Sequence, residues 1–192
     1  MPRPKSFDPD QALTEAMALF WAKGYGATSI SDLETHLQLG RISLYSAFGS
    51  KKQLFLRCLE KYRRDITAPL LQKLDDKDGL RGIRNFFATV LTSPPDIRRR
   101  GCLIVNTMVA AEEPDHSVDA VIQDHVLRVE QCFLRAIRAG QKAGTIGRHI
   151  KPRGAARLLV TLAHGAFALH RVGVDPALTK TAVRTALAML TV

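Results

Sequence analysis

The chain has 192 residues, of which 46% are hydrophobic and 24% are charged, a composition typical of a globular protein with its own core. No apolar run approaches the roughly 20 residues of a membrane-spanning helix, and the basic start, Met1–Lys5, leads into polar residues rather than into the apolar segment of a signal peptide. Three widely spaced cysteines, Cys58, Cys102 and Cys132, form no CxxC pair, which favours a reducing compartment. We therefore expect a cytoplasmic protein.

The formal net charge of +10 points to a polyanionic partner such as nucleic acid. The excess is spread out, because residues 1–65 hold ten basic and seven acidic side chains and residues 66–192 hold eighteen and eleven. A denser basic group lies between residues 41 and 64, where Glu60 is the one acid; its members are Arg41, Lys51, Lys52, Arg57, Lys61, Arg63 and Arg64. A solvated helix face would give the same run, so charge alone does not identify the partner.

The first predicted helix spans residues 9–23. Asp8 is a natural N-cap, Pro9 suits the first helical position and Gly24 suits the end. The helical spacing of its apolar residues indicates one buried stripe, formed by Leu13, Ala16, Met17, Phe20 and Trp21.

Two short helices and a longer one follow. Ser29, with Asp32 three residues later, predicts the capped start of a helix that buries Ile30, Leu33 and Leu37. A third helix is expected over residues 41–48, after the turn at residues 38–40. Ser50 predicts the cap of a fourth helix, which Pro69 should bend or end.

Helical periodicity continues to the end of the chain. We expect helices over residues 79–92, 102–111, 117–143, 152–172 and 176–191. The apolar run in residues 102–111 could also be a buried strand, but no partner strand with alternating pattern exists, so a helix is favoured. The sequence thus predicts an all-α fold of about nine helices. The expected domains are residues 1–50 and residues 51–192, with the fourth helix shared near residues 50–65.

The two short helices joined by a tight turn form a predicted helix-turn-helix, whose second helix enters the major groove of DNA. The segment from Leu39 to Phe55, LGRISLYSAFGSKKQLF, resembles the signature of TetR/AcrR-type repressors: a recognition helix ending in Leu-Tyr-x-x-Phe, then a Ser-Lys helix start and an apolar pair. Upstream, the aromatic, glycine and capping positions of that family match Phe20, Gly24, Tyr25, Thr28, Ser29, Ile30 and Leu33. The resemblance covers about residues 9–56.

This resemblance implies a DNA-binding surface on the third helix. Leu44 and Phe48 should pin that helix onto Leu33 and Leu37, which leaves its other side chains exposed. Arg41 can read guanine or grip phosphate, and Ile42 can contact a thymine methyl group. Further phosphate contacts are expected from hydroxyl groups and helix starts. The remaining predicted DNA-contacting residues are Ser29, Ser43, Tyr45, Ser46 and Lys51.

Two turn positions depart from the family pattern. Gln38 stands where a glycine is usual and Gly40 where a serine is usual. A left-handed Gln costs about 1 kcal/mol, so we expect the turn to use Gly40 instead and to tilt the recognition helix slightly. A third departure is Glu34, which replaces the usual small residue after Leu33.

The last two helices predict a homodimer. One recognition helix contacts too few base pairs for a specific site, and helix-turn-helix proteins read palindromic half-sites by twofold symmetry. Completing the subunit core is the other role these apolar faces could have. The interface residues that we expect are Leu158, Leu162, Ala166, Leu169, Val183, Leu187 and Leu190.

The resemblance also implies that the middle helices enclose a pocket for a small-molecule effector that releases DNA. Its expected lining residues, each of a kind that is more often plain core than ligand contact, are Phe87, Val90, Cys102, Asn106, Met108, Phe133, His164 and Phe167. Cys102 follows three arginines at a helix start, which would favour the thiolate. A redox sensor is therefore one hypothesis for Cys102, but the favoured interpretation is a structural buried cysteine.

Enzymatic motifs are missing from the sequence. None of the six histidines forms HExxH or pairs with cysteine at metal-site spacing, and no P-loop, GxGxxG or GxSxG is present. We expect no catalytic residues, no metal and no cofactor. A small all-helical enzyme and a helical adaptor for a protein partner are the alternatives to a ligand-responsive repressor. A salt-sensitive, palindrome-specific DNA complex would separate the repressor from both.

Overall fold

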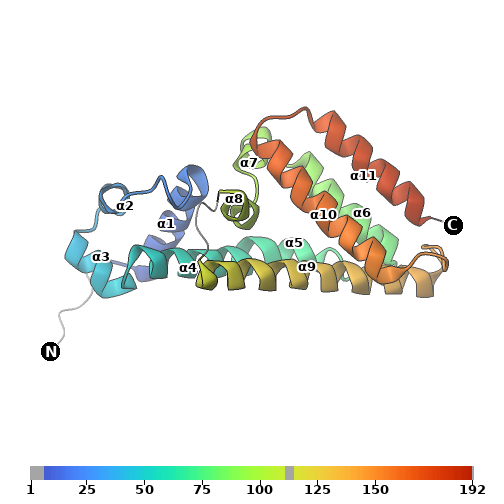
Figure 1. Cartoon of the computed structure of the whole chain (residues 1–192), viewed down its shortest axis with the longest axis horizontal. Helices are drawn as coiled ribbons and strands as arrows, with labels where there is room; N and C mark the ends of the chain where they lie inside the picture. Colours follow the sequence, from blue (N-terminus) through green and yellow to red (C-terminus); the bar gives the residue numbers. More distant parts are fainter. Residues whose placement is uncertain (1–6, 111–114, 192) are drawn as a thin grey trace.

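The computed structural model describes residues 7–110 and 115–191, and these form helices and no strand. The all-α prediction is confirmed. Figure 1 shows an elongated molecule with a small helical head at the N-terminal end and a larger bundle at the C-terminal end. No helix in the described part is long and apolar enough to cross a membrane.

The head contains α1 (Pro9–Lys23), α2 (Ile30–Leu37) and α3 (Arg41–Phe48), packed on the first part of α4 (Lys51–Tyr62). Asp8 caps α1 by accepting from the N–H of Asp10 at 2.9 Å. The stripe predicted for α1 packs on aromatic side chains of α4, because Phe20 meets Phe55 edge-on with ring centroids 5.0 Å apart. Leu33, Leu37, Leu44 and Phe48 are buried as predicted, at 0 to 7% exposure.

The fourth helix does not end at Pro69. It continues through a π-helical turn, η1 (Arg63–Thr67), into α5 (Ala68–Gln72). In an α-helix the proline ring would clash with the carbonyl four residues back. Here the N–H of Ala68 donates to the carbonyl of Arg63, five residues back, and this wider turn leaves Pro69 in the first turn of α5. A turn with π-helical hydrogen bonds therefore accommodates Pro69, where the sequence predicted a bend or an end of the helix.

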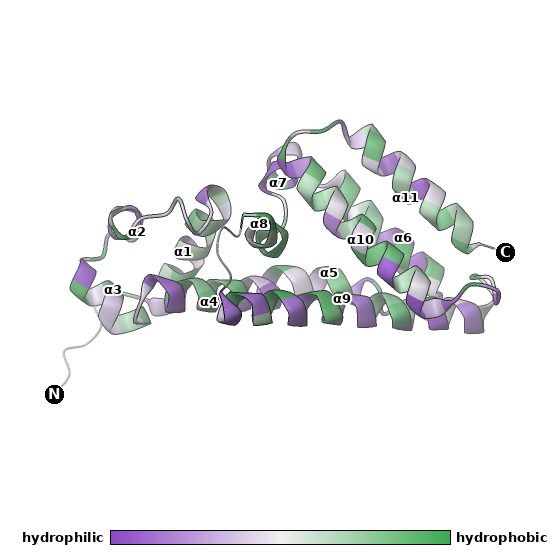
Figure 2. Cartoon of the chain, in the orientation of Figure 1, coloured by the Kyte–Doolittle hydropathy of each residue, from purple (hydrophilic) through white to green (hydrophobic). Residues whose placement is uncertain are grey.

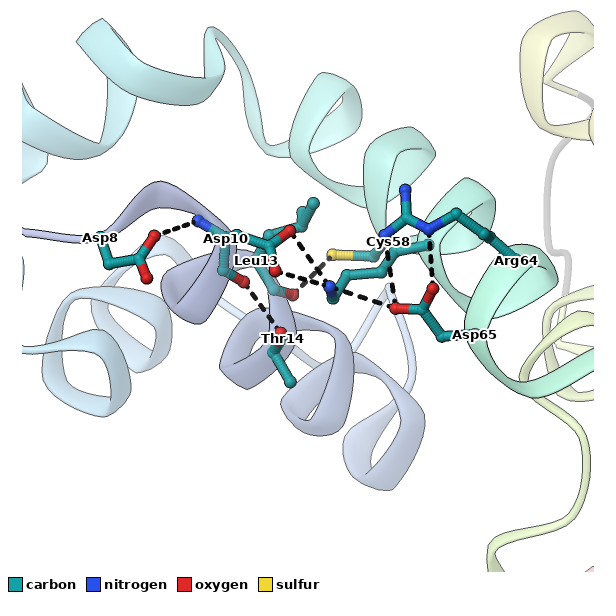
Figure 3. A network of polar contacts seen from close by, with 8 residues as sticks. Asp8, Asp10, Leu13, Thr14, Cys58, Arg64 and Asp65 are labelled. Atoms are coloured by element: carbon teal, nitrogen blue, oxygen red, sulfur yellow. Dashed lines mark hydrogen bonds and ion pairs between the residues drawn. The ribbon is translucent and has the colours of Figure 1, made fainter.

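An ion-pair network joins the start of α1 to this junction (Figure 3). Lys61 Nζ donates to both carboxylate oxygens of Asp10, at 3.1 and 3.0 Å, and lies 3.2 Å from Asp65. Although its side chain is only 7% exposed, these two carboxylates raise the pKa of Lys61, the Asp10 hydrogen bond most. The ammonium group is thus paired, as a buried charge must be.

The C-terminal bundle is built from α6 (Gly79–Thr92), α9 (His116–Ala143), α10 (Pro152–Arg171) and α11 (Pro176–Leu190). Figure 1 shows α9 extending from near α4 along the bundle, and α9 contacts α4, α6 and α10. The bundle core is rich in phenylalanine: the Phe86 ring meets the Phe87 ring at 5.2 Å and the Phe133 ring at 5.1 Å.

Two short helices connect the head and the bundle: α7 (Pro95–Arg100) and α8 (Leu103–Val109). The helix expected over residues 102–111 is α8, whose predicted last residue, Ala111, lies outside the described residues. No helix was expected between residues 92 and 102, where α7 lies. Pro95 at the start, Asp96 in the first turn and Gly101 after the end are helix signals that could have revealed it.

Gly49 provides a stability test, because it has a positive φ of 78° and a Cβ there would lie 1.8 Å from Gln53 Oε1. That oxygen accepts from the N–H of Ser50 in the capping box of α4. We expect Gly49→Ala to lower the free energy of unfolding by about 1–3 kcal/mol in urea titrations. The matched control is Gly154→Ala in α10, where a Cβ meets no atom within 4 Å, so stability should hold or rise. Equal stability of both variants would contradict this account.

Candidate nucleic-acid interface and internal cavity

The outer face of α3 is the candidate interface. Ile42 is 86% exposed and Tyr45 43% exposed, and Arg41, Ser43 and Ser46 are exposed beside them. Leu44 and Phe48, on the opposite face, hold the helix against the head. All five side chains that the sequence analysis assigned to this helix therefore share one solvent-facing surface.

The turn before α3 differs from the expectation in its conformation. Gln38 itself is left-handed, with φ 53° and ψ 37°, while Gly40 is the extended N-cap of α3. The turn therefore accepts the strain at Gln38, about 1 kcal/mol, and does not use Gly40 as the left-handed residue. Glu34 also has a partner: its carboxylate lies 3.3 Å from Arg41 Nη2, so it neighbours the candidate interface directly.

Two capped helix starts flank α3. Ser29 accepts from the N–H of Asp32 at 3.0 Å, and Asp32 accepts from the N–H of Ser29 at 2.8 Å. Lys23, 2.8 Å from Asp32, holds the pKa of that carboxyl well below its usual range. Lys51, at the start of α4, lies over the ring of Tyr25 at 4.3 Å, a cation–π contact that the sequence analysis did not anticipate.

A second candidate site is a partly open cavity of about 370 Å³, within the size range of small-molecule sites. It lies between the head and the bundle, since its walls come from α1, α4, η1, α5, α6, α7, α9 and α10. Trp21 of α1 and Tyr62 of α4 form its wall on the head side, meeting edge-on with centroids 5.0 Å apart.

Four of the eight predicted pocket residues line this cavity: Val90, Cys102, His164 and Phe167. Phe87 and Phe133 are buried in the bundle core behind the wall. Met108 is 40% exposed on α8 and does not line it. Asn106 instead donates to the carbonyl of Arg100 at 2.8 Å.

The carbonyl of Arg100 is a meeting point of three helices. It accepts from Asn106 of α8, from Trp21 Nε1 of α1 at 3.0 Å and from Arg171 of α10 at 3.1 Å. Sequence patterning could not reveal this, because the acceptor is a backbone atom. The head is thereby hydrogen-bonded to the edge of the cavity, because Gly101, the residue after Arg100, lines the cavity.

Of the two interpretations of Cys102, the structure supports the structural buried cysteine. Cys102 is 4% exposed, and burial raises the pKa of its thiol, with Tyr62 as a hydrogen-bonding neighbour. The arginines of α7 do not reverse this effect, so the geometry argues against a redox-sensitive thiolate. All three cysteines are buried and unpaired with each other.

The cavity wall holds three histidines, of which the sequence analysis had identified only His164. The rings of His125 and His164 stack with centroids 5.9 Å apart. Burial, and to a lesser extent the neighbouring His164, lower the pKa of His125 to about 4. The Nε2 atom of His170 has a hydrogen-bond partner, because it lies 2.9 Å from Thr179 Oγ1. The Thr179 hydroxyl itself donates to the carbonyl of Pro176.

The predicted interface residues divide into two groups. Ala166, Val183 and Leu190 are at most 3% exposed and belong to the protomer's own core, so they can add little to a dimer contact. Leu158 is 50% exposed, and Leu162, Leu169 and Leu187 are half-buried. Three further apolar side chains are exposed on or beside the same two helices: Val172, Leu178 and Met189. Figure 2 shows this mixture of hydrophobic and polar residues along α10 and α11.

The head, with its exposed α3, defines a helix-turn-helix regulatory protein. Residues 12–58 match the family model of bacterial regulatory proteins of the tetR family, and residues 79–186 match that of the tetracyclin repressor-like C-terminal domain. Because the two models together span most of the chain, the protein belongs to the TetR family. Its members are transcriptional regulators, and the chain is a regulator rather than an enzyme.

Individual relatives agree with this assignment. The chain is 27% identical to the HTH-type transcriptional regulator YezE of Bacillus subtilis over 148 residues, 76% of each chain. It is 42% identical to the HTH-type transcriptional repressor BdcR of Escherichia coli over 74 residues, 38% of each chain. Among solved structures, a cysteine mutant of the TetR family regulator CifR in complex with operator DNA aligns with a TM-score of 0.83 and 27% identity, covering 97% of this chain and 98% of that one.

His125 predicts a pH dependence of stability. The pKa of His125 is roughly 6.5 in the unfolded chain and about 4 in the folded protein. Between these pH values the unfolded chain binds more protons, so the free energy of unfolding decreases as the pH is lowered. From about pH 7 to about pH 5, His125 should remove about 2 kcal/mol from the free energy of unfolding.

Urea titrations at both pH values should show a shallower pH dependence for His125→Leu than for wild type. Some slope will remain, because burial also lowers the pKa of His164 and of His170. Identical slopes in the two proteins would contradict the assignment of a neutral, buried His125.

Proposed function

We propose that the protein is a cytoplasmic repressor that binds a palindromic operator as a homodimer and leaves it when a small molecule enters the cavity. The observation that carries this proposal is the exposed face of α3, from Arg41 to Ser46, held outward by the buried pair Leu44 and Phe48. The complex of the related CifR with operator DNA supports it.

Recognition would divide between base and phosphate contacts. Arg41 would contact guanine or phosphate after giving up its exposed pairing with Glu34, which is worth little in water. Ile42 would meet a thymine methyl group, and Ser43, Tyr45 and Ser46 would donate hydroxyl groups. Ser29 and Lys51, at the starts of α2 and α4, would hold the flanking phosphates.

Dimerisation would use the exposed apolar side chains of α10 and α11. A monomer rarely leaves such a group of apolar residues in water, and two helices from each subunit would form a four-helix contact. Leu158, Leu162, Leu169 and Leu187 remain in this proposal, with Leu178 and Met189 added from their exposure.

Release would follow from the position of Trp21. This residue belongs to α1 of the head, yet it lines the cavity and donates to the carbonyl of Arg100. A ligand in the cavity would press on Trp21 and Tyr62, shift the head and change the distance between the two recognition helices of the dimer. A coupling free energy of about 1–3 kcal/mol is typical of such linkage.

Arg41→Ala tests the recognition surface. We expect it to weaken binding to a duplex that the wild-type protein selects from a random pool by about five- to 150-fold, because one base contact is worth about 1–3 kcal/mol. Electrophoretic mobility shifts at fixed salt measure this. Arg148→Ala, in the exposed segment before α10, is the matched control and should bind as wild type. Full affinity in Arg41→Ala would refute the assignment.

Leu158→Glu tests the dimer. A carboxylate in the centre of an apolar contact should shift the protein to monomers at micromolar concentration in sedimentation velocity, because its burial is unfavourable. Leu127→Glu is the control: Leu127 lies on α9 and is 56% exposed, outside the proposed interface, and this variant should remain dimeric. A dimeric Leu158→Glu protein, or a monomeric wild type, would rule out this interface.

A further inference from the structure

The C-terminal end of α3 is held by a side chain of α4. Arg57 Nη1 donates to the carbonyl of Ala47 at 3.2 Å. The guanidinium carbon of Arg57 lies 5.9 Å from the centre of the Phe48 ring, within the range of a cation–π contact. One side chain thus contacts both the main chain and the last side chain of the candidate recognition helix.

The main chain of α3 has few other fixed points. The helix has eight residues, too few to be stable on its own. Its N-cap is Gly40, which has no side chain to accept from the first N–H groups, whereas Ser29 and Ser50 form capping boxes at α2 and α4. Among the hydrogen bonds of the described residues, that of Arg57 is the one that a side chain makes to the main chain of α3.

The charge of Arg57 also suits the end of α3 at which it lies. The last carbonyl groups of a helix carry a partial negative charge that a nearby cation stabilises. The last turn of α3 contains no basic residue of its own. The carbonyl of Tyr45 accepts from the N–H of Gly49 at 2.8 Å, and Arg57 supplies the partner of Ala47 together with the missing cation.

Phe48 connects this contact to the core of the head. It is the last residue of α3 and is 3% exposed. Its ring also meets the ring of Phe7, with centroids 6.4 Å apart. The end of α3 is therefore held at its backbone and at its last ring by the same residue of α4, which restricts the angle between the two helices.

The angle of α3 determines where its exposed side chains reach. From Ala47 to Arg41 the helix rises about 9 Å, so a tilt of about 10° about Ala47 moves the backbone of Arg41 by about 1.5 Å. Side chains that bind a partner specifically must be held to within roughly 0.5 Å. A small tilt of α3 would therefore loosen base contacts, while the charge of the head that faces the phosphates would stay the same.

We infer that Arg57 is a positioning residue for operator recognition: through Ala47 and Phe48 it sets the angle at which α3 enters the major groove, and it contacts no base itself. This inference rests on the proposed function, because it takes the outer face of α3 to be the surface that reads DNA. The other role open to an arginine at this place is a direct contact to a phosphate, and the experiment separates the two roles.

Arg57→Met tests the inference, because methionine keeps part of the side chain and removes its charge and its hydrogen bond. Fluorescence anisotropy measures binding to two duplexes, one that the wild type selects from a random pool and a scrambled one of the same composition. We expect Arg57→Met to bind the selected duplex about five- to tenfold more weakly, the lower part of the range for loss of one base contact. Its affinity for the scrambled duplex should change by less than about twofold, because nonspecific binding depends on phosphate contacts.

The salt dependence identifies the kind of contact. Each phosphate contact contributes about 0.9 to the slope of log affinity against log salt concentration. Removal of a positioning residue leaves this slope at its wild-type value. Removal of a residue that grips a phosphate makes the slope shallower by about one.

Arg64→Met is the matched control. Arg64 is an exposed arginine further along the same continuous helix, and it pairs with Asp65 rather than with α3. Its removal takes away the same charge and should leave the discrimination between the two duplexes unchanged. Arg57→Lys keeps the charge and an N–H donor and should recover most of the lost affinity for the selected duplex. Urea titrations check that every variant is folded.

An Arg57→Met protein that discriminates between the duplexes as well as the wild type would overturn the inference. So would equal weakening on both duplexes, a slope shallower by about one, the same loss in Arg64→Met, or a lysine variant as weak as the methionine variant. If the wild type selects no duplex, the proposed function fails and the inference fails with it. A selective wild type with an equally selective Arg57→Met protein refutes the positioning role alone.

Discussion

The carbonyl oxygen of Arg100 is the acceptor on which the connection between head and bundle depends. Trp21, Asn106 and Arg171 all donate to it, and they come from α1, α8 and α10. The head is also attached through the continuous helix of α4, η1 and α5, and through the packing of α8 and the first part of α9 into its core. The hydrogen bond from Trp21 fixes the end of α1 to the rim of the cavity, beside α7.

The start of α1 is fixed separately. Lys61 holds Asp10 and Asp65 together at the junction of α4 and η1, and Cys58 Sγ approaches the carbonyl of Leu13 at 3.8 Å (Figure 3). One end of α1 is thus tied to the long helix and the other to the wall of the cavity. A rod held at both ends moves as a unit, which is consistent with the release mechanism that we propose.

Much of the fold could be predicted from the sequence because helix signals are local. Caps at Asp8, Ser29 and Ser50 and the apolar stripes marked the helix limits closely. The outer face of α3 followed from the same periodicity. The turn was the exception: the cost of a left-handed Gln38 is small enough for the packing of Leu37 and Leu44 to override it.

The cavity was harder to predict, because its wall combines residues from distant segments. Trp21 belongs by pattern to the core stripe of α1, and nothing local distinguishes it from Phe20. His125 lies in a polar stretch of α9. Its burial in the cavity wall depends on the packing of α4 and α10, which the local sequence does not reveal. For Cys102 the sequence left two interpretations open, because its neighbours in sequence are arginines, but its neighbours in space are Tyr62 and apolar side chains.

The π-helical turn at Arg63–Thr67 adds a consequence for the two halves of the long helix. A π turn contains one more residue than an α turn, and each residue of an α-helix rotates the chain by about 100°. Everything beyond η1 is therefore turned about the helix axis relative to an uninterrupted continuation of α4. Ile66, Thr67 and Leu71 face the cavity in this register, so loss of a single residue here would point α5 elsewhere and leave the cavity open on one side.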